Sequence, residues 1–112
     1  MATPAIEKPR PKERHKIRIT VGPTGNFTYA PSHLRAKRGD ILIFSSDGNK
    51  PFEVMFKSHS PGDKLYLSND CPELLVRDDI PYGIYRYAAA VWDEARKRVF
   101  LDSGCGEVGV EK

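Results

Sequence analysis

Apolar and polar residues alternate with a period of two along most of the chain from His15 onward. This period is typical of β-strands that bury one face. It is clearest in Lys16–Val21 (KIRITV) and in Gly39–Ser46 (GDILIFSS), and the turn-forming pair Asp47-Gly48 follows the second run. The pattern predicts about seven or eight short strands separated by turns, which is typical of an antiparallel β-sandwich.

The longest apolar run is the segment Ile84–Asp93 (IYRYAAAVWD). As a strand it would place Tyr85 and Tyr87 on one face and Trp92 on the other. Its three alanines would also allow a helix, but the tyrosines favour a strand. The charged segment Glu94–Lys97 is then expected to form a hairpin loop that leads into a pairing strand.

The length of 112 residues predicts a single domain, which we place at residues 15–112. Residues 1–14 form a basic, Pro-rich arm that we expect to be disordered. Residues 1–18 hold six Lys or Arg and two Glu, whereas the remainder holds 12 basic and 13 acidic residues. The positive charge is thus a property of the arm. Without a basic stripe among the aromatic residues, the rest of the chain argues against nucleic acid as a partner.

The distribution of apolar residues argues against a membrane partner and against secretion. No apolar stretch approaches the roughly 20 residues of a membrane helix, and the first residues lack the apolar core of a signal peptide. We therefore expect a cytoplasmic protein. A disulfide between Cys71 and Cys105 would close a loop of about 35 residues and contribute roughly 4 kcal/mol. A reducing cytoplasm argues against that bond, so two free thiols are expected.

Four motifs follow one another in a recognisable order. They are Phe27–Phe44 (F-x-Y-x-P-x-x-L-x-x-x-x-G-D-x-L-x-F), Asn49–Phe56 (N-x-P-F-x-V-x-F), Gly83–Tyr87 (G-x-Y-x-Y) and Gly106–Val110 (GEVGV). Together they resemble the cupredoxins, the blue-copper β-sandwich family that includes plastocyanin. The resemblance covers about residues 16–110 and implies a cupredoxin-like antiparallel Greek-key β-sandwich. On physical grounds alone, Asp40 suits the acceptor of a turn N–H, and Tyr85 suits a tyrosine corner.

The copper ligands of that family do not carry over. Blue copper is bound by two His, one Cys thiolate and a weak axial ligand such as Met. The resemblance places the first His at Phe52, the Cys at Ala89, and the second His and the Met in the loop beyond Ala89. That loop (VWDEARKRVF) contains neither residue type. Since Phe and Ala cannot donate to a metal, we expect no copper and no other cofactor, with Phe52 filling the ligand's volume.

A non-standard metal site is the alternative. The remaining candidate ligands are His15, His33, Met55, His59, Cys71 and Cys105, and no two of the His and Cys residues are spaced at i, i+2 or i, i+4. His59 and Cys71 fall in or near one long polar connection, so a metal-binding or redox site could combine them with Cys105. Neither cysteine has a base close to it in sequence, and we expect no enzymatic activity.

A binding module is what remains. We predict an interaction surface formed by Ile84, Trp92, Arg96 and Arg98, because an aromatic patch with a charged rim is typical of interfaces. In the alternative, Trp92 packs beneath the connection between residues 57 and 72. The expected partner is an unknown protein or small ligand, and an edge strand could also pair two copies into a homodimer.

Overall fold

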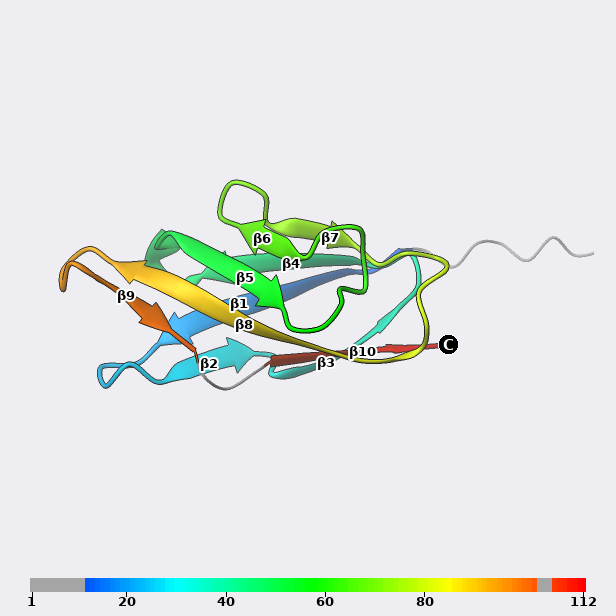
Figure 1. Ribbon diagram of the computed structural model, residues 1–112, viewed down its shortest axis with the longest axis horizontal. Coiled ribbons are helices and arrows are strands. Elements are labelled where there is room, and N and C mark those ends of the chain that lie inside the picture. The colour runs from blue at the N-terminus through cyan, green and yellow to red at the C-terminus, as the bar shows by residue number, and fades with distance from the viewer. Residues whose placement is uncertain (1–11, 103–105) are drawn as a thin grey trace, which may run out of the picture.

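The computed structural model describes residues 12–102 and 106–112 (Figure 1). Within these ranges the chain forms ten strands and one short 3-10 turn. They are β1 (Arg14–Val21), β2 (Phe27–Ala30), β3 (His33–Lys37), β4 (Ile41–Ser46), η1 (Asp47–Asn49), β5 (Phe52–Phe56), β6 (Tyr66–Ser68), β7 (Glu73–Leu75), β8 (Gly83–Asp93), β9 (Arg98–Leu101) and β10 (Gly106–Glu111). No helix in the described ranges is long and apolar enough to cross a membrane.

The strands form two sheets that pack face to face. Sheet A has the order β2-β1-β4-β7, and sheet B has the order β3-β10-β8-β5-β6, with β9 pairing to β8 as well. The expected all-β sandwich is confirmed. It is mixed rather than purely antiparallel, because β1 runs parallel to β4 and β10 runs parallel to β3. Parallel neighbouring strands require a long connection. Between β1 and β4 the chain passes through β2 in sheet A and then through β3 in sheet B.

Strand β8 confirms the predicted division of faces. Tyr85, Tyr87, Ala89 and Val91 are buried between the sheets, whereas the alternate residues face outward. Tyr87 lies at the centre of the core, where its ring makes edge contacts with three other aromatic rings of the core. The three alanines therefore lie in a strand and not in a helix, and every second residue of this strand enters the core.

Two turn predictions are also confirmed. The Tyr85 hydroxyl donates a 2.6 Å hydrogen bond to the carbonyl of Pro81, which is a tyrosine corner. Burial raises the pKa of Tyr85. The backbone N–H of Lys37 donates to the Asp40 carboxylate at 2.9 Å, across a turn in which Gly39 adopts a φ of +89° that favours glycine.

The first strand begins close to the predicted boundary between the arm and the domain. β1 begins at Arg14, because Arg14 pairs with Ile41 and the carbonyl of Glu13 accepts the N–H of Ile41 at 2.9 Å. Glu13 and Arg14 are therefore part of the folded domain. Residues 1–11 of the predicted arm lie outside the described residues.

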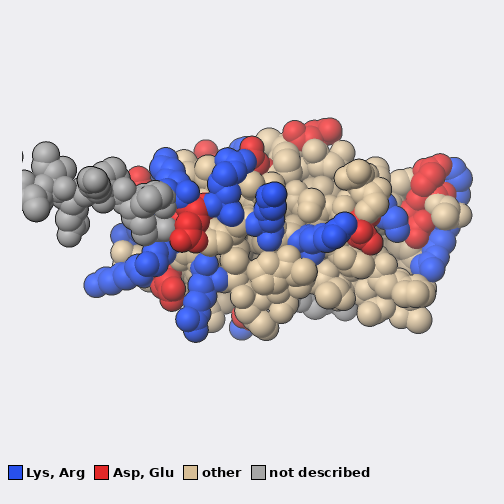
Figure 2. All heavy atoms as spheres, turned by 180° about the vertical axis from the view of Figure 1, so that it is seen from behind, with Lys and Arg blue, Asp and Glu red and all other residues tan. Residues whose placement is uncertain are grey.

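The outer face of sheet A carries a row of basic side chains. Arg14, Lys16 and Arg18 alternate with inward-facing residues along β1 and are exposed. Figure 2 shows Lys and Arg gathered along this side of the molecule. Part of the basic charge that we assigned to the arm therefore lies on the folded domain. Exposed carboxylates face two members of the row, with ion pairs Arg14–Glu73 at 2.6 Å and Arg18–Asp47 at 3.0 Å.

Candidate functional site

The positions that the resemblance assigns to copper ligands lie inside the core. Phe52 begins β5 and pairs with Val91, while Ala89 on β8 pairs with Val54. Phe52 is 7% exposed and Ala89 is 5% exposed. The hairpin that follows β8 supplies no His, Cys or Met. A ring and a methyl group offer no lone pair, so these residues do not fit a copper ion.

Two members of the second set of predicted ligands, His59 and Cys71, contact other residues. The exposed His59 ring packs edge-on against Tyr85, with 5.2 Å between the ring centroids. Cys71 is an exposed free thiol whose sulfur accepts a hydrogen bond from the Lys64 amine at 3.3 Å. Cys105 lies outside the described residues. Neither His59 nor Cys71 belongs to a group of three potential ligands in the described ranges.

The four residues predicted to form one interaction surface are divided between two faces. Ile84 and Trp92 share the outer face of β8, as expected, and Ile84 is 61% exposed. Arg98 pairs with Asp93 and therefore points to the opposite face from Trp92. Arg96 and Arg98 both lie over the ring of Phe100. Sequence spacing could not show this division, because it depends on the register of the β8–β9 hairpin.

Trp92 itself is partly covered. Its indole Nε1 donates to Glu94 at 2.7 Å, and the ring borders a hollow that Ser68 and Asn69 also line. Trp92 thus lies next to the connection between residues 57 and 72, which favours the alternative that Trp92 packs against this connection.

A mostly apolar hollow of about 360 Å³, which Glu53 and Asp102 also line, lies on the outer face of sheet B. Its floor is formed by Ala88 and Ala90, whose small side chains leave the sheet surface low. Met55 and Tyr66 border it on one side, and Leu101, which is 74% exposed, borders it on the other. Register explains the arrangement, since Met55 pairs with both Tyr66 and Ala88, and Ala90 pairs with Leu101. Sequence reasoning missed this surface because it joins residues from four strands.

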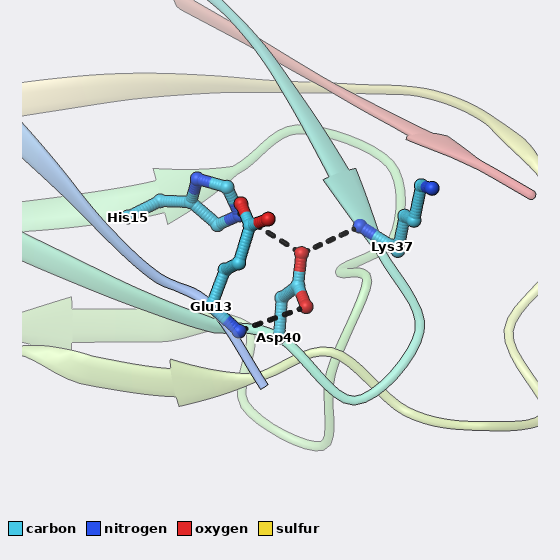
Figure 3. Close-up of polar contacts among 4 residues, drawn as sticks. All are labelled: Glu13, His15, Lys37 and Asp40. Carbon is cyan, nitrogen blue, oxygen red and sulfur yellow. Dashed lines mark hydrogen bonds and ion pairs between the residues drawn. The ribbon is translucent and has the colours of Figure 1, made fainter. Parts of the chain in front are cut away.

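A polar cluster lies at the other end of the sandwich, where β1 begins (Figures 1 and 3). The Nε2 atom of His15 lies 2.8 Å from Oδ2 of Asp40 and 3.7 Å from Oε2 of Glu13. The Asp40 side chain is 1% exposed, that of His15 is 14% exposed, and that of Glu13 is 66% exposed. The ligand atoms of all three lie within 4.8 Å of one another.

Backbone groups hold Asp40 in this position. Its Oδ2 accepts the N–H of Lys37 at 2.9 Å, and its Oδ1 accepts the N–H of Glu13 at 3.3 Å (Figure 3). A carboxylate only accepts, so the hydrogen between His15 and Asp40 belongs to Nε2 of the imidazole. From the sequence, Asp40 was predicted only to accept a hydrogen bond from a backbone N–H in a turn. His15 and Asp40 are 25 residues apart, and only the parallel pairing of β1 with β4 brings them together.

Comparison with known proteins supports the fold. The chain matches no protein-family model and no curated protein. Among solved structures, a pseudoazurin from Sinorhizobium meliltoi matches 88% of this chain and 75% of its own, at 15% identity and a TM-score of 0.50. The oxidized form of plastocyanin from Dryopteris crassirhizoma matches 84% of this chain and 99% of its own, at 19% identity and a TM-score of 0.47. The two-sheet strand arrangement and the likeness to pseudoazurin show that this chain has a cupredoxin-like fold.

Proposed function

We propose that this protein is a copper-free, non-enzymatic binding module whose docking surface is the outer face of sheet B. The apolar hollow between Met55 and Leu101 carries the proposal. Exposed apolar surface of this kind is typical of interaction sites. The outer face of sheet A differs, since it carries the basic row of β1. Phe52 and Ala89 support the absence of copper, because they fill the core without a donor atom.

The occupant we propose is a second copy of this chain. Leu101 projects from β9 beside a hollow floored by alanines, so one surface provides both a projection and a recess. A two-fold axis would place Leu101 of each copy in the hollow of the other, which is the self-complementary contact of a C2 dimer. Val99 is 49% exposed and lies on the same face of β9, where it would extend the contact.

Analytical ultracentrifugation across a wide concentration range tests this occupant. We expect a monomer–dimer equilibrium that Leu101→Ser weakens by at least about tenfold, since a central apolar anchor contributes more than about 1.4 kcal/mol. Leu75→Ser is the matched control, because Leu75 is 47% exposed but lies on β7 in sheet A. A wild-type protein that stays monomeric at every concentration, or equal effects of the two substitutions, would refute self-association through this face.

Copper content is tested separately. Protein produced in copper-supplemented medium is expected to contain no stoichiometric copper and to lack the intense blue absorption of a copper–thiolate site. One copper per chain with that absorption would overturn the copper-free assignment while leaving the dimer question open.

A further inference from the structure

We propose that Glu13, His15 and Asp40 form a site for a divalent transition metal ion, with Zn²⁺ as the ion they suit best. The site is unrelated to the copper position of the fold, since it lies where β1 begins and not where β5 begins (Figure 1). It also differs from the metal site considered in the sequence analysis, which would use His59, Cys71 and Cys105.

The donor set fits zinc chemically. It comprises one imidazole nitrogen and two carboxylate oxygens, which are ligand types that Zn²⁺ accepts at about 2.0–2.2 Å. There is no thiolate, so the set does not suit blue copper. It also has too few oxygens for Ca²⁺, which takes about six to eight oxygen ligands. Glu13 is exposed, and its side of the cluster is open to solvent, which would supply water as the fourth ligand.

Two of the three distances between the ligand atoms are close to those around a tetrahedral ion, and the third, from Glu13 to Asp40, is within 4.8 Å. In a tetrahedral zinc site, neighbouring ligand atoms are about 3.3–3.4 Å apart. Here the separation is 2.8 Å for His15 to Asp40 and 3.7 Å for His15 to Glu13, so one is shorter and the other longer than that value. Each would change by about half an ångström. The exposed Glu13 side chain can rotate to close the longer distance.

The charges also favour a cation. Two carboxylates face one imidazole, so the cluster carries a net negative charge whether or not the ring is protonated. A divalent ion with a neutral imidazole balances both carboxylates. On binding, Nε2 gives up its hydrogen. A neutral ring regains it at Nδ1 through solvent, whereas a protonated ring releases one proton to solvent. The two backbone N–H groups remain on Asp40 and orient it, which is the role that outer hydrogen bonds have in metal sites.

Zn²⁺ titration of the full chain by isothermal calorimetry tests the site. We expect one saturable site, and Glu13→Gln should weaken it by at least about tenfold. That side chain is exposed and the backbone bonds of Glu13 do not depend on it, so the variant should fold normally. His15→Gln removes the nitrogen ligand but keeps an N–H for Asp40, and it should weaken binding at least as much. The controls are His33→Gln and Cys71→Ser, which replace exposed ligand types elsewhere and should leave binding unchanged.

Two outcomes would overturn the proposal. One is the absence of saturable binding up to millimolar Zn²⁺. The other is undiminished binding by both Glu13→Gln and His15→Gln, which would leave the His15–Asp40 contact as a structural hydrogen bond only. A direct readout is the ¹⁵N resonance of His15 Nε2, which should shift on addition of one equivalent of Zn²⁺ in the wild type and in both control variants.

Discussion

Gly106 and Tyr87 show how one residue limits another in this core. A Cβ on Gly106 would lie 2.2 Å from Cζ and 2.3 Å from the hydroxyl oxygen of Tyr87, which is fully buried. That separation is far inside van der Waals contact. Because Tyr87 is held by aromatic rings on several sides, it cannot move away without loss of packing.

We therefore expect Gly106→Ala to lower the free energy of unfolding by roughly 1–3 kcal/mol through overpacking. Gly109→Ala is the control in the same strand, since its Cβ would meet only the Leu34 carbonyl at an ordinary 3.8 Å. Urea denaturation of both variants measures the difference. Equal stabilities would show that the core beside Tyr87 accommodates a methyl group.

At the scale of elements, the pairing of β5 with β8 places the two residues that the resemblance assigns to copper ligands. Adjacent strands bring Phe52 and Ala89 to the same buried face, two residues apart in register. At these two positions, to which the resemblance assigns a His and a Cys, the side chains complete an apolar core. The same pairing places Met55 and Ala88 outward, where they line the hollow of the proposed docking surface.

The double substitution Phe52→His with Ala89→Cys tests this interpretation. We expect it to destabilise the domain by a few kcal/mol, because it removes a buried ring and buries polar groups without partners. Met55→His is the control on the same strand and should change stability little, since Met55 is 43% exposed. A double variant as stable as the parent protein, measured by thermal unfolding, would mean that Phe52 does not support the core.

At the scale of the whole molecule, a hydrogen bond joins the two sheets. The hydroxyl of Tyr29, on β2 of sheet A, donates to Asp102, which follows β9 of sheet B. Burial, and then the hydrogen bond to Asp102, raise the pKa of Tyr29. The contribution to stability is fully present below the pKa of an unfolded tyrosine, about 10. Above that pH the unfolded chain releases a proton that Tyr29 retains, so stability falls as pH rises.

Tyr29→Phe should therefore make the alkaline loss of stability less steep, by up to about 1.4 kcal/mol per pH unit. At neutral pH the variant should be less stable by roughly 1 kcal/mol, because a hydrogen bond between the sheets is lost. The difference in the free energy of unfolding between the wild type and the variant should become smaller above pH 10. Urea unfolding between pH 7 and pH 11 measures both effects, and parallel curves would contradict the assignment.

The sequence by itself determined the strands, the buried face of β8, the tyrosine corner and the sandwich class. These properties follow from period-two alternation and turn chemistry, which act between residues close together in the chain. Only the tertiary structure decided that β1 and β4 run parallel, and therefore that His15 meets Asp40. It also decided that Arg98 turns away from Trp92 and that Leu101 borders Ala90. Each of these contacts depends on strand order or register, which local patterns do not specify because the two partners are brought together by packing.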